Sequence, residues 1–228
     1  MIDEKQLLKI ISESIPKGDE ESLNEAYVAQ PKVYPQVSDL LSQQTKDSHA
    51  KLYQNYAKKL SEVSFKIDTA DRLGANSSSS SYRSLKVDEA KLHNATYLHE
   101  LYFANCFDPH SEIFMDTLAY MRLQRDFGTF EQWQADFMAC AQSARDGWVV
   151  CGYSTFLRKF VNTFVDGNEA NIMMGLIPVL VIDVHEHAYY RDYLDDKKSF
   201  IVAMMQELNW DVIESRFKKV DAIDGAMK

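Results

Sequence analysis

The chain has 228 residues, of which 46% are hydrophobic and 26% charged, and its formal net charge at pH 7 is −9. This composition is typical of a soluble globular protein, and the negative charge disfavours nucleic acid and anionic membrane surfaces as partners. No apolar run approaches membrane-spanning length, and the sequence has none of the glycine patterns of nucleotide-binding loops.

The N-terminal segment carries no recognisable chemistry. Residues 1–25 predict a short amphipathic helix and a charged linker, and the proline-punctuated residues 27–35 predict an extended segment. The first residues are polar and lack the features of a signal peptide. The chain's three cysteines form no closely spaced pair, which argues against a disulfide framework and favours buried thiols. We therefore expect a cytoplasmic protein.

Two long helices are predicted in the first half. The first begins at Ser38, with Ser38 or Asp39 as its N-cap. The second runs from about Val87 to Phe107 and ends before Asp108-Pro109, because the residue preceding a proline disfavours helix. The glycine- and serine-containing stretch 71–81 predicts a flexible crossover between them. The pair therefore predicts an antiparallel helical hairpin.

After Pro109 the pattern becomes mixed. Helices followed by alternating strands and helices favour an α+β protein, with an N-terminal antiparallel helical hairpin and then an α/β domain containing a small antiparallel sheet. We divide the chain into an extension (1–26), a helical hairpin domain (27–109) and an α+β C-terminal domain (110–228). The elements expected there are helices 112–125 and 130–145 (N-cap Thr129), two strands within 148–165 broken at Gly152, a loop 167–174, a strand 179–183, a helix beginning near His187, and helices 198–208 and 211–219.

The predicted strand 179–183 leads directly into candidate metal ligands. This apolar run ends in Asp183, and His185 and His187 follow at the start of the next helix. A rigid strand-to-helix junction is a common place for ligand-bearing side chains. An aspartate beside imidazoles suits iron, manganese or zinc. The alternative is a strand end with a capping aspartate and two surface histidines.

Two further histidines lie on the long helices. His49 shares one helix face with Tyr53 and Tyr56, and His99 lies in an aromatic stretch. Each is also compatible with an ordinary core histidine, whereas we expect His93 at the surface and His110 in a loop. Three imidazoles and one carboxylate leave a divalent ion with a net charge of +1, which favours binding of a small anion. A zinc hydrolase is disfavoured because no free carboxylate base accompanies the ligands.

Several segments resemble the iron/manganese superoxide dismutase family. The similarity extends from about Tyr27 to Phe217. It is most specific in the Asp-Val-x-Glu-His-Ala-Tyr-Tyr signature at 183–190, and it also includes 99–105, 126–133, 147–148 and 209–211. The resemblance implies one iron or manganese ion per subunit, with superoxide anion as substrate. The implied metal ligands are His49, His99, Asp183 and His187.

The resemblance also implies functions for residues around the ion. Tyr56, seven residues after His49, would be the gateway tyrosine of the substrate channel, although some family members place this residue eight positions on. Trp148 would belong to an aromatic shell. Glu186 would reach across a homodimer interface to His187 of a second copy, and Tyr190 would approach that copy's Tyr53. The alternative for Tyr56, Trp148 and Tyr190 is that they only pack in an aromatic core.

Two positions depart from the family pattern. His185 stands where tryptophan is usual, and it is open to a structural substitution, altered tuning of the metal or, least favoured, direct ligation. Family members carry an amide side chain, usually glutamine, that hydrogen-bonds to the metal-bound solvent from one of two positions. Here Ala95, which has no amide, occupies one position and Asn168 the other. The amide of Asn168, shorter than that of glutamine, is therefore our candidate. Lys197 aligns with an arginine that attracts the anion in the family and is our candidate for that function, with a solvated surface lysine as a nearly equal alternative.

These observations predict a superoxide dismutase that forms oxygen and hydrogen peroxide by alternating reduction and oxidation of the metal. Tyr56, Asn168 and His185 are the candidate catalytic residues, because proton delivery and tuning require groups near the ion. The alternative is a catalytically weak or inactive metal-binding or interaction protein with the same fold. The expected assembly is a homodimer or a higher oligomer.

Overall fold

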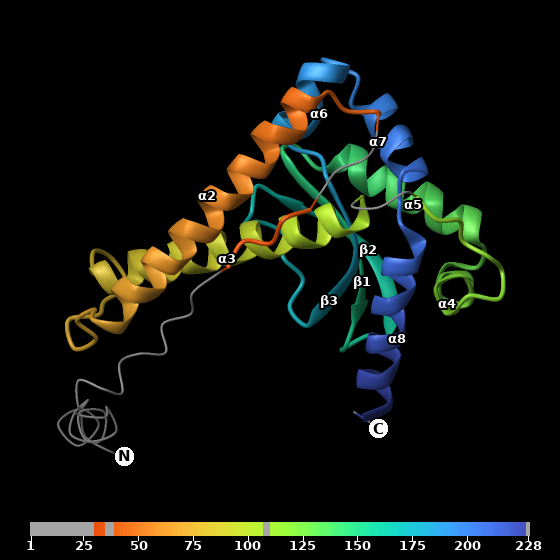
Figure 1. The fold of residues 1–228 in the computed structure, drawn as a ribbon. Coiled ribbons are helices and arrows are strands. Elements are labelled where there is room, and N and C mark those ends of the chain that lie inside the picture. The colour runs from red at the N-terminus through yellow and green to blue at the C-terminus, as the bar shows by residue number, and fades with distance from the viewer. Residues whose placement is uncertain (1–29, 35–38, 107–109, 227–228) are drawn as a thin grey trace.

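The computed structural model describes residues 30–34, 39–106 and 110–226. A helical hairpin leads into a mixed region in which five further helices surround a three-stranded sheet (Figure 1). The elements in chain order are α2 (Gln43–Asp68), α3 (Ser81–Asn105), α4 (Leu118–Phe127), α5 (Phe130–Ser143), β1 (Gly147–Ser154), β2 (Lys159–Asp166), β3 (Leu176–Asp183), α6 (Glu186–Tyr193), α7 (Lys197–Gln206) and α8 (Trp210–Ala226). The predicted α+β class is therefore confirmed.

The sheet has the order β2-β1-β3, and both pairs of strands are antiparallel. Every residue of the central strand β1 is buried, as expected for a strand covered on both faces. In the register of β1 and β3, Trp148 lies opposite Asp183. The sheet thus places an indole beside the residue at which β3 ends.

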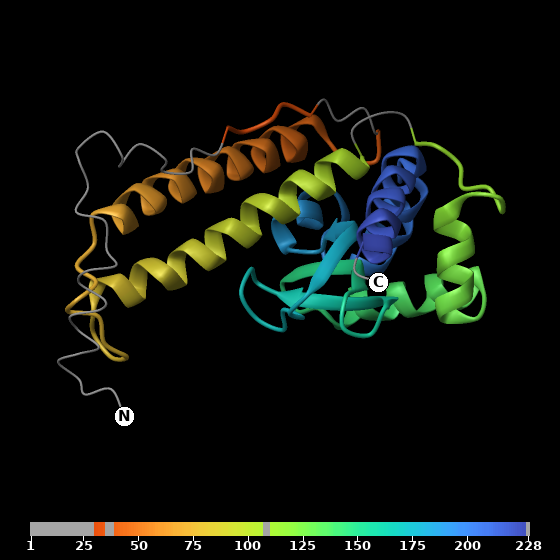
Figure 2. The same ribbon diagram turned by 90° about the horizontal axis from the view of Figure 1, so that it is seen from below.

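The hairpin and the sheet pack against each other. The helices α2 and α3 contact each other, and Figure 2 shows α3 on the side nearer the sheet, where it contacts β3. The helix α6 contacts α2, while α5 contacts β1 and β2. The end of β3 and the start of α6 therefore lie close to both helices of the hairpin.

Two predicted helix starts are wrong, and in both cases a serine hydroxyl caps the observed start. The helix α2 begins at Gln43 rather than near Ser38, because the Ser42 hydroxyl accepts a hydrogen bond from the Thr45 N–H at 3.3 Å. The helix α3 begins at Ser81 rather than near Val87. Its cap is Ser80, whose hydroxyl accepts from the Arg83 N–H at 3.3 Å.

Three other boundaries also needed correction. The helix predicted over 112–125 begins only at Leu118, where the Thr117 hydroxyl caps it. Gly152 does not break the strand: β1 continues through it, and the chain reverses at residues 155–158. A β-carbon at Gly152 would lie 2.9 Å from the Ile177 carbonyl oxygen, so glycine permits the close approach of β3. The final helix extends beyond 219 to Ala226.

Other expectations correspond well to the structure. Thr129 caps α5, with its hydroxyl accepting from the Gln132 N–H at 3.1 Å. All three cysteines are free, and Cys106 and Cys151 are buried, whereas Cys140 is partly exposed. None of the described helices is both long and apolar enough to cross a membrane. The predicted helix within 1–25 and the domain boundary at Pro109 lie outside the described residues.

Candidate metal centre

The centre is built on the junction between β3 and α6. The strand ends at Asp183, which is fully buried, and the helix begins at Glu186. Backbone pairing holds the junction against the sheet, because the Val184 N–H donates to the Gly147 carbonyl oxygen at 2.9 Å. His187 lies in the first turn of α6, and its side chain is 33% exposed. Asp183 and His187 thus point to one place from a rigid support.

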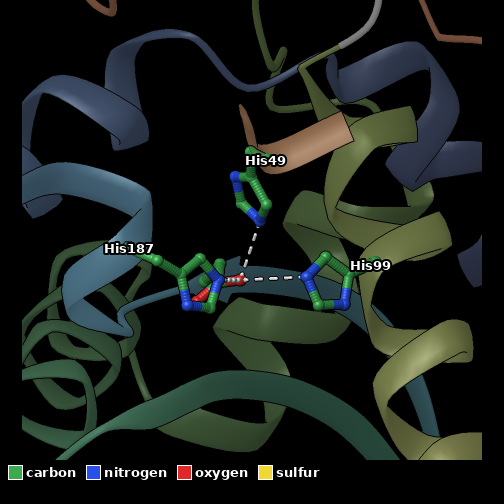
Figure 3. Close-up of side chains that lie close together, drawn as sticks. His49, His99 and His187 are labelled. Carbon is green, nitrogen blue, oxygen red and sulfur yellow. Dashed lines mark hydrogen bonds and ion pairs between the residues drawn. The ribbon is translucent and has the colours of Figure 1, made fainter. Parts of the chain in front are cut away.

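The hairpin contributes two buried imidazoles to the same place. His49 comes from α2 and His99 from α3. The Nε2 atoms of His49 and His187 lie 3.1 and 3.2 Å from Asp183 Oδ2, and the Nε2 atom of His99 lies 3.6 Å from it. Figure 3 shows the three imidazoles converging. One candidate ligand atom from each of the four residues lies within 4.8 Å of all the others.

The protonation states of these side chains fit a cation. The His99 Nδ1–H donates to the Ala95 carbonyl oxygen at 2.6 Å, which leaves the lone pair of Nε2 facing the centre. Among the described residues this buried Nε2 has no hydrogen-bond partner. Burial lowers the pKa of His99 to about 3 and also lowers the pKa of His49. Both rings are therefore neutral near pH 7, as metal ligation requires.

The carboxylate supplies the negative charge. Burial alone would raise the pKa of Asp183, but the neighbouring His185 and His187 outweigh it and hold this pKa well below its usual range. One ionised carboxylate and three imidazoles form a donor set that suits a single divalent or trivalent ion of borderline hardness. The residues therefore fit one iron or manganese ion.

Three of the predicted outer residues lie next to this donor set. The Trp148 ring packs edge-on against His99 with centroids 4.7 Å apart, and its Nε1–H donates to Asn168 Oδ1 at 2.9 Å. The Tyr56 ring lies 5.4 Å from that of His99. Burial, followed by the charge of Asp183, raises the pKa of Tyr56. The charge of Lys91, and then a hydrogen bond with Asn168, partly opposes this rise. Asn168 thus connects Trp148 with Tyr56.

The residues predicted at a subunit interface are divided between the core and the surface. Tyr53 is buried; it donates to Glu100 Oε1 at 3.0 Å and accepts from the Lys32 N–H at 3.0 Å. Tyr190 is 53% exposed, and the side chain of Glu186 is also exposed. An open depression of about 510 Å³ is lined by Ser48, Glu186, His187, Tyr190 and Arg191.

His185 and Lys197 occupy positions that the sequence left open. The His185 Nδ1 lies 2.7 Å from Asp183 Oδ1, the oxygen that faces away from the other histidines, and His185 is absent from the cluster of candidate ligand atoms. Lys197 Nζ donates to the Ala144 carbonyl oxygen at 2.5 Å, so this ammonium group is bound to the backbone.

Sequence reasoning overlooked Tyr102, Phe103 and Asn94, which shape the centre, and gave Ala95 no role of its own. Tyr102 and Phe103 pack on His49, with ring centroids 5.3 and 4.9 Å away. Their spacing of three and four residues from His99 was an available signal, because such residues share a helix face. Ala95 contributes only its carbonyl oxygen. Asn94 donates to the Asn168 carbonyl oxygen at 2.9 Å, which no local pattern could have indicated.

A helical hairpin against an α+β region, with three imidazoles and one carboxylate where they meet, defines a mononuclear metal-binding protein. Comparisons with known proteins narrow this class. Residues 117–216 match the family described as iron/manganese superoxide dismutases, C-terminal domain.

Curated relatives extend the match beyond that domain. The chain is 34% identical to the iron superoxide dismutases of Aquifex pyrophilus and Aquifex aeolicus over 179 residues, which cover 77% of this chain and 83% of each relative. It is 38% identical to manganese superoxide dismutase 1 of Halobacterium salinarum over 98 residues, 43% of this chain and 48% of the relative. The chain therefore belongs to the iron/manganese superoxide dismutase family.

Proposed function

We propose that the protein is a superoxide dismutase that converts superoxide to oxygen and hydrogen peroxide at one iron or manganese ion. The observation that carries this proposal is the convergence of His49, His99, Asp183 and His187 in a chain of this family. When bound, the ion supplies one-electron chemistry, accepting an electron from one superoxide and returning it to another. Cytoplasmic localisation stays an expectation from the sequence.

The chain's own residues would deliver protons to the reduced substrate. Burial and the charge of Asp183 keep the Tyr56 phenol protonated near pH 7, and Asn168 holds its oxygen by a hydrogen bond. Trp148 fixes Asn168 in turn through its Nε1–H. We infer that Tyr56 holds one of the two protons that the second superoxide needs to become hydrogen peroxide, the other coming from solvent, since a proton donor must lie within hydrogen-bond reach. The buried aromatic rings limit water around the centre.

A homodimer is part of this proposal. Glu186 and His187 line the same open depression, and Tyr190 beside them is largely exposed. A carboxylate from a second copy could accept a hydrogen bond from the outer edge of the His187 ring and thereby orient this ligand. Tyr190 would add apolar area to such a contact. The exposed position of these three side chains supports the arrangement, and sedimentation velocity tests it.

The proposed function is tested by loading the wild-type chain separately with iron and with manganese. We expect one ion per chain and catalysed decay of superoxide with at least one of the two metals. His99→Ala should lose most of the bound metal and the activity, because it removes a ligand whose Nε2 has no other described partner. Metal content by mass spectrometry and superoxide decay by stopped flow are the measurements.

The matched control lies on the same helix. His93 is exposed on α3, six residues before His99, and His93→Ala should retain both metal and activity. A chain that binds either metal but leaves superoxide decay at its uncatalysed rate would instead be a non-catalytic member of the family. Equal metal content in the two variants would contradict the site itself.

A further inference from the structure

The two oxygens of Asp183 have different neighbours. Oδ2 faces the Nε2 atoms of His49, His99 and His187 at 3.1, 3.6 and 3.2 Å. Oδ1 points the other way, towards His185, and lies 2.9 Å from its backbone nitrogen and 2.7 Å from its Nδ1. One residue thus contacts the outer oxygen twice, whereas the candidate metal side of the carboxylate has no contact with His185.

The direction of the side-chain hydrogen bond follows from the charge of its acceptor. Asp183 must be deprotonated to bind the ion, and its Oδ1, which already accepts from the His185 backbone N–H at 2.9 Å, can therefore only accept. His185 Nδ1 therefore carries the proton and donates it. The separation of 2.7 Å is short, as is usual for hydrogen bonds to ionised acceptors, which are also stronger than neutral ones.

Packing fixes the His185 ring in this geometry. The residue is only 6% exposed. Its ring stacks on that of His187, with centroids 4.8 Å apart and planes 21° apart, and meets the Trp148 ring edge-on at 5.3 Å. A ring confined between two others cannot turn away from Oδ1 without breaking these contacts. The donor is therefore preorganised, and direct ligation by its Nδ1 is excluded because that atom already binds Oδ1.

We propose that His185 is a positioning residue that sets the reduction potential of the ion through its Nδ1–H bond to Asp183 Oδ1. The inference deepens the proposed function and rests on it. A strong hydrogen bond to the outer oxygen draws negative charge away from the oxygen that faces the ion. With this hydrogen bond, Asp183 is a less negative ligand and stabilises the trivalent ion less than it would without the bond. The bond therefore raises the reduction potential of the ion. Hydrogen bonds to ligands are an established means of tuning redox-active metals.

Two substitutions at one position separate the hydrogen bond from the bulk of the ring. His185→Phe keeps a ring but has no donor. His185→Asn places an amide N–H close to the position of Nδ1, and asparagine is favourable at an N-cap, the position that residue 185 occupies before α6. Both variants keep the backbone N–H bond to Oδ1. All three chains are loaded with iron, checked for metal content and far-ultraviolet circular dichroism, and titrated in a spectroelectrochemical cell.

We expect His185→Phe to lower the equilibrium constant for reduction about tenfold, which for one electron is a fall of about 59 mV. His185→Asn should restore most of that change. Equal potentials in the wild type and His185→Phe, or an equal fall in both variants, would overturn the inference while leaving the proposed function intact. His185→Leu, a second variant without a donor, decides the question if His185→Phe does not load. A wild-type chain that binds neither iron nor manganese would overturn the proposed function and this inference together.

Discussion

At the scale of single residues, burial determines which groups of the centre carry charge. The imidazoles of His49 and His99 are held neutral because no water reaches them to stabilise the protonated form. Asp183 is equally buried but stays ionised, because the electrostatic attraction of His185 and His187, and then hydrogen bonding with these rings, lowers its pKa. The same burial makes polar groups outside the donor set sensitive to the loss of a partner.

Asn168→Ala is expected to affect both stability and turnover. The substitution leaves the buried Trp148 N–H without its acceptor, which should lower the free energy of unfolding by about 1–3 kcal/mol. It also removes the amide that holds Tyr56, so turnover of the metal-loaded protein should fall about tenfold, less than the roughly 10²–10⁴-fold cost of losing a proton donor outright, because the phenol itself remains. Urea unfolding and stopped-flow kinetics measure the two effects.

The control for Asn168 lies four residues along the same loop. Ile172 is 44% exposed, and Ile172→Ala should leave turnover unchanged. Metal content should be the same in both variants, because neither residue is a candidate ligand. Wild-type turnover in Asn168→Ala would show that Asn168 does not serve the proton path.

The buried thiol of Cys151 gives a prediction for alkaline pH. Burial raises the pKa of Cys151 from an ordinary 9.0 to about 12, so the folded state keeps a proton that the unfolded chain loses. The resulting stabilisation is fully present below pH 9 and is lost as the pH rises towards 12. Between these values the unfolding free energy of the wild type should fall more steeply than that of Cys151→Ala, by about 1.4 kcal/mol per pH unit.

Chemical denaturation at a series of pH values measures this difference in slope. Cys106, whose pKa burial also raises to about 12, is present in both proteins, so its contribution cancels. Parallel curves for the two proteins would mean that the Cys151 thiol is not buried in solution.

The four candidate ligands were predicted from the sequence through the family resemblance. The local pattern indicated only Asp183 and His187 at a strand end, and helix periodicity left His49 and His99 open between ligand and core residue. The partner of His185 was not predictable in this way. Which oxygen of Asp183 it meets depends on the Trp148 and His187 rings that confine it. Three-dimensional packing alone decides whether His185 forms a hydrogen bond to Asp183 or ligates the ion.

At the scale of elements, the caps show where sequence patterns are ambiguous. Thr129 was identified as a cap because it is a single threonine directly after Gly128. The run Ser77–Ser81 offers five equivalent hydroxyl groups before one helix, so the pattern could not choose among them. The structure selects Ser80, and α3 is six residues longer than predicted at that end.

Ser80→Ala should therefore destabilise the protein, whereas a neighbouring serine should not. Loss of the hydroxyl leaves the Arg83 N–H at the start of α3 without its acceptor and should lower the free energy of unfolding by about 1 kcal/mol. Ser78 is exposed, and its backbone N–H donates to Asn76 Oδ1, so Ser78→Ala keeps that bond and should change little. Thermal unfolding compares the variants, and equal melting temperatures would contradict the assignment of the cap.

At the scale of the whole molecule, a buried polar network joins segments that are far apart in the sequence. Arg216 of α8 donates to Asn105 Oδ1 at 2.5 Å, to the Val179 carbonyl oxygen at 2.9 Å and to the Leu101 carbonyl oxygen at 3.1 Å. Asn105 donates in turn to the Val181 carbonyl oxygen at 2.8 Å. The network holds β3 against α3, and these elements carry Asp183 and His99.

No sequence pattern could have predicted this network. Arg216 and Asn105 are 111 residues apart, and helix periodicity indicates only that each faces inward. Burial lowers the pKa of Arg216 to about 10, which leaves it cationic at neutral pH with oxygen acceptors around it. Arg216 lies on α8 and its partners lie on α3 and β3, so the packing of these three elements depends on one part-buried cation.

Arg216→Met tests this dependence. Methionine retains much of the apolar stem but leaves the Leu101 and Val179 carbonyls and Asn105 Oδ1 without their donor. We expect the free energy of unfolding to fall by roughly 3 kcal/mol, because removing one partner from a buried network exposes the others to the cost of desolvation. Lys218→Met on the same helix removes only an ion pair with Glu214 in which the lysine side chain is 67% exposed, and it should cost less than about 0.5 kcal/mol. Because the network holds β3 against α3, Arg216→Met should also bind metal more weakly at a temperature where it is still folded. Equal stability of the two variants in urea would mean that α8 is held by its apolar face alone.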